Sequence, residues 1–304
     1  MKQLAFALAA FAGFAAVLAA EAPPIRLLPE KLPQVEREPG KAVKETWDWA
    51  KEMIPVARKF TGREGMVVLL GDSLTYANQS TAWARGGKAA KGATASDKSI
   101  LAWSHADDGR TETNGWWQAA VDRPGGRSET AASGIRTDQY IKGGFNGLPS
   151  LAAVLKKFNP QVAFILLGSN DARGRNPDDV VKDMNTIVET VLNNGTIPVL
   201  TTLPPAANEK MHGRVKEINQ RYLGLAAARR IPIIDLYGEF LSRGPAGTWK
   251  DTLVGPDGVH LTYELASGPP TEENLKNCGY LLRCYVTVQK LKQIKEKVVD
   301  KAGK

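Results

Sequence analysis

The clearest pattern in the sequence is a set of four short apolar runs, each followed at once by glycine or small polar residues. The first, residues 67–70, reads Val-Val-Leu-Leu between Gly65 and Gly71. A run this short is typical of a strand covered on both faces, because a buried helix needs more residues. Three later segments repeat the pattern and are also expected to form strands: residues 160–171, 195–205 and 231–240.

Helical patterns separate these predicted strands. Residues 176–195 have Asn176 as a helix cap, Pro177 at the first helical position and Gly195 after the end. Residues 208–230 form the next helical stretch. Strands that alternate with helices of this length predict right-handed crossovers, and therefore an α/β fold with a parallel sheet and helices on both of its faces.

The first 40 residues differ from the rest of the chain. Residues 1–20 combine a lysine near the start with an apolar stretch and small residues, which is the pattern of a secretory signal peptide cleaved between positions 19 and 22. A membrane anchor is the alternative, because the apolar stretch approaches spanning length. Residues 21–40 contain five prolines and are expected to be a linker. A single folded domain is then expected over residues 41–304.

Composition excludes several kinds of partner. The net charge of +8 is largely dispersed, and no basic segment carries the interleaved aromatic residues that bind nucleic acid, so we expect no nucleic-acid partner. No set of cysteine, histidine and carboxylate residues has metal-ligand spacing, so the sequence implies neither a metal nor another cofactor. Cys278 and Cys284 would face different sides of one helix, which favours two buried thiols over a disulfide.

Ser73 is expected at the carboxyl end of the first strand, where ligands bind in open α/β sheets. The alternative is that Asp72 or Ser73 only caps the following helix. A serine becomes a nucleophile when a histidine removes its proton and a carboxylate orients that histidine. Among the three histidines His260 fits this role, because Asp257 precedes it by three residues in a predicted loop. The other two, in a basic helix and in an irregular segment, have no such partner nearby in the sequence.

Four short motifs carry a family resemblance. They are GDSL at residues 71–74, SG at 133–134, GSND at 168–171 and DGVH at 257–260. In this order they look like the four signature blocks of the SGNH, or GDSL-type, hydrolase family. The blocks span most of the expected domain, from the first strand to just before the last helix. The resemblance implies a three-layer α/β/α sandwich around a mainly parallel sheet, as in flavodoxin-like folds.

The same resemblance implies a role for each motif residue. Ser73 would be the nucleophile, His260 the general base and acid, and Asp257 the group that orients His260. The backbone N–H groups of Ser73 and Gly134 and the side-chain amide of Asn170 would form an oxyanion hole. A plain turn residue is the alternative for Asn170. The residues ahead of Gly134 depart from the family's pattern, so four other glycines compete for its role: Gly125, Gly126, Gly143 and Gly144.

Residues 76–126 look like an insertion relative to compact family members, and long loops at this edge of a sheet usually shape the substrate site. Its aromatic side chains could stack on sugar rings. The candidates for substrate binding are Trp83, Trp103, His105, Trp116 and Trp117. The alternative, equally open, is that the tryptophans form a small core that packs the insertion onto the domain.

Together these features predict an exported serine esterase, periplasmic or secreted, that hydrolyses a small acyl ester through an acyl-enzyme. The expected substrate is a small ester or an acylated carbohydrate, with acetyl as the preferred acyl group. No stable membrane partner is expected once the signal peptide is removed. Three alternatives stay open: a lipolytic or aryl esterase, an O-acyltransferase that uses the same site, and a non-catalytic glycan-binding protein. The last is disfavoured because all the key side chains are present.

Overall fold

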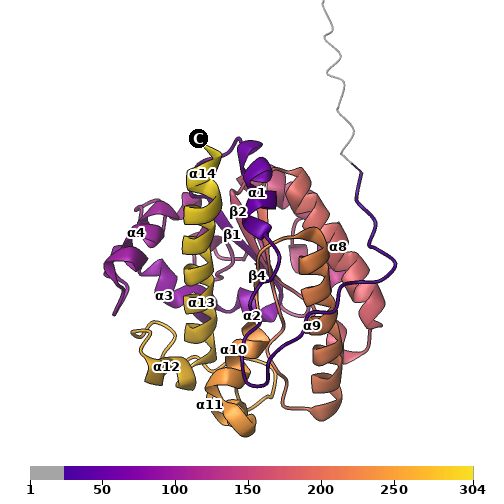
Figure 1. The fold of residues 1–304 in the computed structure, drawn as a ribbon. Helices are drawn as coiled ribbons and strands as arrows, with labels where there is room; N and C mark the ends of the chain where they lie inside the picture. Colours follow the sequence, from indigo (N-terminus) through magenta and orange to yellow (C-terminus); the bar gives the residue numbers. More distant parts are fainter. Residues whose placement is uncertain (1–23, 304) are drawn as a thin grey trace, which may run out of the picture.

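A parallel sheet of four strands lies at the centre of the computed structural model, which describes residues 24–303 (Figure 1). The strands follow one another in the order β1 (Val67–Gly71), β2 (Val162–Leu166), β3 (Ile197–Thr201) and β4 (Ile233–Ile234). All four predicted strands are confirmed. The predicted signal peptide at residues 1–20 lies outside the described residues. Within the described range, no helix is long and apolar enough to cross a membrane.

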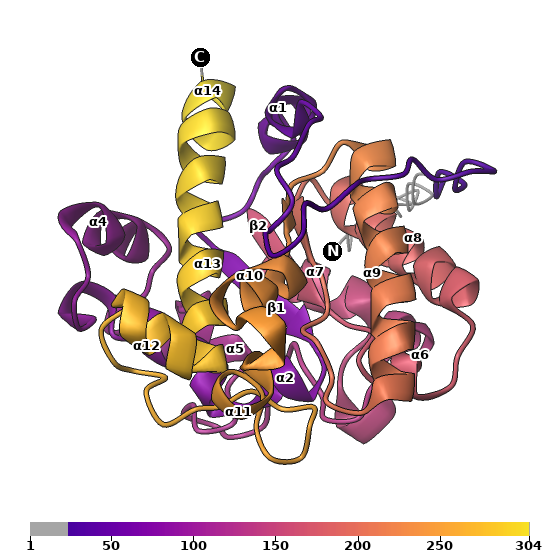
Figure 2. The same cartoon turned by 60° about the horizontal axis from the view of Figure 1, so that its bottom comes forward.

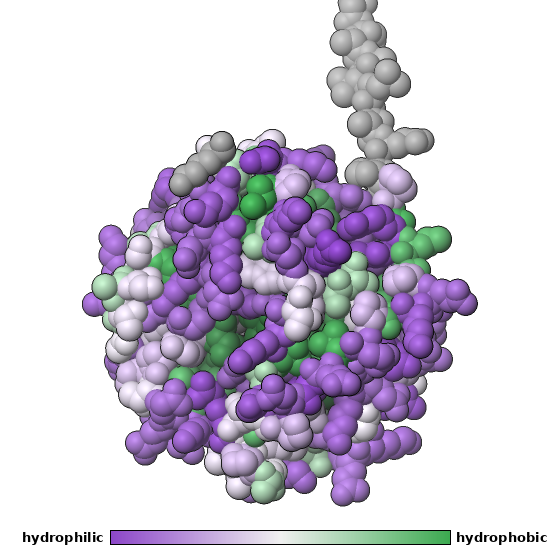
Figure 3. All heavy atoms as spheres, viewed as in Figure 1, coloured by the Kyte–Doolittle hydropathy of each residue, from purple (hydrophilic) through white to green (hydrophobic). Residues whose placement is uncertain are grey.

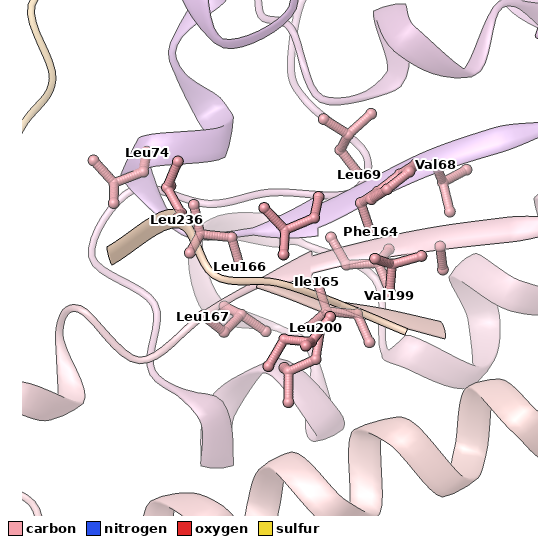
Figure 4. Close-up of a cluster of buried hydrophobic side chains, with 14 of the residues drawn as sticks. Val68, Leu69, Leu74, Phe164, Ile165, Leu166, Leu167, Val199, Leu200 and Leu236 are labelled. Atoms are coloured by element: carbon pink, nitrogen blue, oxygen red, sulfur yellow. The ribbon is translucent and has the colours of Figure 1, made fainter. Parts of the chain in front are cut away.

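The core lies on both faces of this sheet. Every residue of β1, β2 and β3 is buried, which agrees with their uninterrupted apolar sequences. Figure 4 shows Val68, Phe164 and Val199, from three neighbouring strands, packed in this core. Outside the core, the face of the molecule seen in Figure 3 is mainly hydrophilic, with apolar residues gathered in a depression near its centre.

Helices surround the sheet, and the longest ones form the outer layers. In Figures 1 and 2 the helices α8 and α9 lie on one side of the strands, and α1 and α13 lie on the other. The three-layer α/β/α arrangement predicted from the sequence is therefore confirmed. The helices are α1 (Trp49–Arg58), α2 (Ser73–Tyr76), α3 (Ala82–Arg85), α4 (Ala95–Trp103), α5 (Gly115–Gln118), α6 (Thr137–Lys142), α7 (Leu151–Phe158), α8 (Pro177–Asn193), α9 (Glu209–Arg229), α10 (Leu236–Arg243), α11 (Trp249–Thr252), α12 (Glu272–Asn277), α13 (Gly279–Ile294) and α14 (Asp300–Ala302).

A fifth segment pairs with β1 at a single position. Ala131 forms a parallel bridge with Gly71: the Gly71 N–H donates to the Thr130 carbonyl, and the Ala132 N–H donates to the Gly71 carbonyl, both at 3.2 Å. Counted with this segment, the spatial order of the chain's sheet segments is 2-1-3-4-5, the flavodoxin-like order. The order reverses beside β1, and ligands bind at such a reversal outside the carboxyl ends of the strands.

The segment from residue 24 to 48 contains no strand and no helix, as its prolines predict, yet it lies against the folded body. Arg37 makes two hydrogen bonds of 2.7 Å to Asp235, the cap of α10, whose carboxylate is buried. Arg26 pairs with Glu189 on α8 at 3.0 Å, and that carboxylate is also buried. The residues expected to be a free linker therefore contribute ion pairs to the domain from Arg26 onward.

The insertion at residues 76–126 folds into short helices that pack on the body rather than into an open loop. Its helices α3 and α4 lie against α13, and α5 lies against β1. At the start of α5, a side-chain carbon on Gly115 would come 1.5 Å from the Val67 carbonyl oxygen, so only glycine fits there. Elsewhere, Cys278 and Cys284 are both buried and unpaired, as predicted, although the chain does break between α12 and α13 at Cys278.

Candidate active site

Ser73 begins the four-residue helix α2 immediately after β1. Asp72, just before it, is the helix cap, and its carboxylate accepts a hydrogen bond of 3.0 Å from the Leu74 N–H. Gly71 ends β1, and α2 lies so close to it that a side chain at this position would collide with Thr75 of α2. Since Asp72 caps the helix, the Ser73 hydroxyl is left free for another partner.

That partner is His260, which lies 187 residues further along the chain. The His260 Nε2 atom is 3.0 Å from the Ser73 Oγ atom, and the His260 Nδ1 atom is 2.5 Å from the Asp257 Oδ2 atom. The other Asp257 oxygen accepts from the backbone N–H groups of Val259 and His260 at 3.0 and 2.9 Å. These bonds fix the loop so that the three side chains form one continuous series.

The charge state of Asp257 suits this series. Burial alone would raise its pKa, but the hydrogen bonds from the His260 ring and from the backbone N–H groups of Val259 and His260 outweigh burial and lower the pKa. The ionised carboxylate therefore accepts a hydrogen bond from the protonated Nδ1 atom of His260. The Nε2 atom of the same ring then has a lone pair available for the Ser73 hydroxyl.

Gly134 and Asn170 lie close together at the carboxyl ends of the strands, the end of the sheet where Ser73 lies. Both line one surface hollow of about 550 Å³, and the Asn170 side chain donates a 3.0 Å hydrogen bond to the Ile135 carbonyl, one residue after Gly134. None of the four competing glycines lines this hollow. Gly134 has a φ of +85°, which favours glycine, and within the described residues neither its N–H nor that of Ser73 donates a hydrogen bond.

Comparison with known proteins identifies the family of this chain. The model of the GDSL-like lipase/acylhydrolase family matches residues 69–265, a range that includes Ser73, Gly134, Asn170 and His260. The chain belongs to this family. It is a hydrolase of ester bonds. A search of curated proteins found no match to this GDSL-like hydrolase.

Solved structures of GDSL-type proteins resemble this chain at low sequence identity. A GDSL-like lipase from Bacteroides thetaiotaomicron is 19% identical, covering 80% of this chain and 97% of its own, with a TM-score of 0.47. An aryl esterase from M. smegmatis is 17% identical, covering 74% and 99%, with a TM-score of 0.42. A carbohydrate acetylesterase from Sinorhizobium meliloti is 16% identical, covering 74% and 99%, with a TM-score of 0.44. The family assignment rests on the sequence match.

In this GDSL-like hydrolase, α2 is also held by a residue that the sequence analysis did not single out. Arg283 on α13 is buried, and its guanidinium donates to the Leu74 carbonyl at 2.5 Å and to the Thr75 hydroxyl at 2.7 Å. Asp72 lies close by, and burial raises the pKa of its carboxyl group to about 6. Arg283 lies beyond residue 265, where the family match ends, and it belongs to none of the four motifs, so nothing in the sequence singles it out.

The position of Asn170 is likewise fixed by its neighbour Asp171, which is part of the GSND motif but has no role in the predicted site. Asp171 is fully buried and accepts hydrogen bonds from the Thr137 hydroxyl at 2.9 Å and from Arg175 at 2.7 Å. These bonds tie the turn after β2 to the start of α6. They fix the backbone on both sides of the Gly134 and Asn170 pair.

Two of the tryptophans proposed to bind substrate are buried. Trp83 is 1% exposed and Trp116 is 0% exposed, and their ring N–H groups donate to the Lys91 carbonyl and the Ser104 hydroxyl. Neither ring can stack on a sugar, so the prediction that Trp83 and Trp116 bind substrate is wrong. These two residues instead form part of a small core that packs the insertion onto the domain, as the alternative interpretation predicts.

Two further candidates, Trp103 and His105, lie away from the site. Trp103 donates to the Glu64 side chain at 3.0 Å, and the His105 ring lies 2.5 Å from the Glu64 carbonyl. Glu64 precedes β1, whereas Ser73 follows it, so Trp103 and His105 lie at the opposite edge of the sheet. The Arg85 guanidinium lies over one face of the Trp117 ring at 4.0 Å, and substrate binding by Trp117 stays a prediction. Within residues 24–303, no hydrogen bond or ring contact joins any of these three side chains to Ser73 or His260. Sequence position alone could not reveal where Trp103 and His105 lie, because the insertion folds back along β1.

Proposed function

We propose that this hydrolase is an exported serine esterase that removes a small acyl group, preferably acetyl, from a carbohydrate through an acyl-enzyme. The observation that carries the proposal is the hydrogen-bonded series from Asp257 through His260 to Ser73. Its distances are those of a nucleophile, a base and an orienting carboxylate.

In the proposed first step, His260 Nε2 takes the proton of Ser73 as the Ser73 oxygen attacks the ester carbonyl. The resulting tetrahedral intermediate collapses when the imidazolium of His260 gives its proton to the departing sugar hydroxyl. Water then attacks the acyl-serine, again with His260 as base, and the carboxylic acid leaves. Asp257 stays ionised and stabilises the imidazolium at each step.

The carbonyl oxygen gains negative charge in both steps, and three donors could meet it. The unused N–H groups of Ser73 and Gly134 and the amide of Asn170 are assigned to this oxyanion hole. Because the glycine and the amide are held by the segments that flank β1, they need little rearrangement during the reaction.

A short acyl group and a sugar suit the surroundings of Ser73. The hollows beside the Gly134 turn are lined largely by polar and charged side chains rather than by a long apolar groove. A cavity of about 840 Å³ lies elsewhere, between the residue 25–34 segment and helices α8 and α9. It offers no place for a fatty chain attached to Ser73.

One observation favours an aryl or lipid ester as the second candidate. Tyr263 and Leu265, shortly after His260, are 56% and 37% exposed, and they are large apolar side chains next to the site. They could bind an aromatic or aliphatic leaving group. A panel of acetylated polysaccharides, nitrophenyl esters and lysophospholipids separates the two candidates, because the preferred class gives the highest kcat/KM.

The mechanism is tested with a fluorophosphonate probe, which reacts with activated serines. We expect labelling at Ser73, none in Ser73→Ala, and kcat lowered by on the order of 10⁴ or more in that variant. Ser99→Ala, at an exposed serine on α4, is the matched control and should be labelled normally. Labelling that persists in Ser73→Ala would place the nucleophile elsewhere. Export is tested separately by amino-terminal sequencing of protein recovered outside the cytoplasm.

A further inference from the structure

The turn at Ser133 and Gly134 has a hollow on each side. The larger, of about 550 Å³, contains Gly134 and Asn170, and we call it the arginine hollow after the side chains that line it: Arg136, Arg173 and Arg175. The smaller, of about 140 Å³, is lined by Tyr76 and Arg127, and we call it the tyrosine hollow. Tyr76 ends the helix that Ser73 begins, and Gly134 and Asn170 are the assigned oxyanion donors, so each hollow contains a residue close to the reacting centre.

The three arginines of the larger hollow differ in how they are paired. Arg175 forms 2.7 Å ion pairs with Asp171 and Asp183, and Arg136 pairs with Asp138 at 3.1 Å. Arg173 is exposed, and its guanidinium has neither an ion pair nor a hydrogen bond within residues 24–303. It is therefore the arginine of this hollow whose charge is open to a ligand.

The tyrosine hollow has a similar cation. The Arg127 guanidinium lies over Gly147, where any side chain would meet it at 2.1 Å, and it has no ion pair with a described carboxylate. The loop that carries Gly147 separates the two hollows. Phe145 of this loop lines the arginine hollow, and Asn146 lines the tyrosine hollow and donates to the Ser133 carbonyl at 3.3 Å.

A guanidinium without a carboxylate partner can bind a carboxylate of a ligand through two parallel hydrogen bonds. Here one such group lies on each side of the turn that supplies the Gly134 N–H. We propose that Arg173 and Arg127 bind anionic groups on the two sides of the reacting ester, so that the substrate is an acylated acidic polysaccharide such as a polyuronate. This inference rests on the proposed esterase function and specifies its substrate.

The test compares acetate release from an acetylated polyuronate with release from the same polymer after its carboxylates are converted to neutral amides. We expect the native enzyme to have a higher kcat/KM on the acidic polymer, and 0.5 M salt to reduce that preference by screening. Arg173→Gln and Arg127→Gln should each reduce the ratio of the two kcat/KM values about fivefold. Lys156→Gln, at an exposed lysine on α7, is the control and should leave the ratio unchanged.

Binding without catalysis separates the two proposals. Calorimetry with the Ser73→Ala protein and the acidic polymer should show affinity that falls in the added Arg173→Gln variant. If the enzyme hydrolyses no ester but this binding is found, the esterase mechanism fails and the acidic ligand stands. If it hydrolyses both polymers equally well, or if both arginine variants lose activity equally on the two polymers, the inference about charge is overturned.

Discussion

At the scale of single residues, Asp72 and Ser73 divide the two tasks that compete at the end of β1. Asp72 caps α2 through the Leu74 N–H, and the Ser73 hydroxyl is 3.0 Å from the His260 ring. If Ser73 capped the helix, its oxygen would point back toward the backbone and away from the histidine. The aspartate in the GDSL motif therefore has a physical function that complements the nucleophile.

Asn170→Ala is expected to lower kcat by on the order of 10² to 10³ and to leave KM nearly unchanged, because the amide is assigned to the oxyanion and not to the ground-state carbonyl. Steady-state kinetics on a nitrophenyl ester measure both constants. The melting temperature is the control, since the side chain makes one hydrogen bond, to Ile135. Near-normal kcat would remove Asn170 from the site.

Asp72 should give the protein an unusual dependence of stability on pH. Burial raises its pKa from 3.8 to about 6, so the folded protein binds this proton more tightly than the unfolded chain does. The contribution of Asp72 to stability is therefore largest at low pH and declines as the pH rises from about 4 to 6. Relative to Asp72→Asn, the native protein should lose unfolding free energy across this interval, measured by urea denaturation at fixed pH steps.

Asp97 provides a control of opposite sign. Burial raises its pKa, but the bonds from Lys292, Thr94 and Gln289 outweigh burial and lower it to about 2. Its stabilisation is present above pH 4 and is lost as the pH falls toward 2. The stability difference between the native protein and Asp97→Asn should thus stay constant between pH 5 and 7. A constant difference for Asp72→Asn in that range would instead place its pKa near the ordinary value.

The sequence could predict the residues of the hydrogen-bonded series but not the surroundings of the tryptophans. Ser73, Asp257 and His260 are recognisable because their chemistry needs particular side chains at strand ends and in one loop. Trp83 and Trp116 give no such signal, because an aromatic side chain has the same sequence appearance in a core and in a binding site. Their burial follows from how the insertion packs on α13 and β1.

At the scale of elements, the C-terminal helix α13 supports the helix that Ser73 begins. Replacement of Arg283 by alanine removes two charge-assisted hydrogen bonds to α2 and should lower the unfolding free energy by about 2 kcal/mol or more. It should also slow fluorophosphonate labelling of Ser73, because α2 would be less firmly held. Arg283→Lys keeps the charge and should recover part of the labelling rate.

The matched control for Arg283 is Arg230→Ala. Arg230 is 60% exposed and pairs with Glu52 at the surface, where an ion pair contributes about 1 kcal/mol or less. Its loss should change neither labelling nor stability appreciably. A normal labelling rate in a folded Arg283→Ala protein would show that α13 does not position the nucleophile.

The strands were predictable and the fifth sheet segment was not, for a physical reason. Each strand is covered on both faces and therefore has an uninterrupted apolar sequence. Residues 130–132 pair with β1 at Gly71 only, so they need no such run. The reversal of strand order beside Ser73 depends on that one pairing, and it becomes visible only in three dimensions.

At the scale of the whole molecule, residues 24–48 act as part of the fold. Arg37→Gln removes two hydrogen bonds to the buried carboxylate of Asp235 and should lower the unfolding free energy by about 2 kcal/mol or more. Chemical denaturation measures the change. Lys31→Gln, at an exposed residue of the same segment, is the control and should have little effect. If both variants were equally stable, Arg37 would not anchor the segment, and the segment would be the linker that its prolines predict.

The position of α5 on β1 has a consequence for solubility. The Met66 carbonyl accepts a hydrogen bond from β2, so the next carbonyl, that of Val67, points to the opposite side of the strand, where α5 begins at Gly115. Without the insertion, this side of β1 would be an open edge with unpaired backbone groups, able to pair with the same edge of another molecule. The insertion thus shields the apolar strand next to the active site from edge-to-edge aggregation, a role that does not depend on substrate binding by its aromatic side chains.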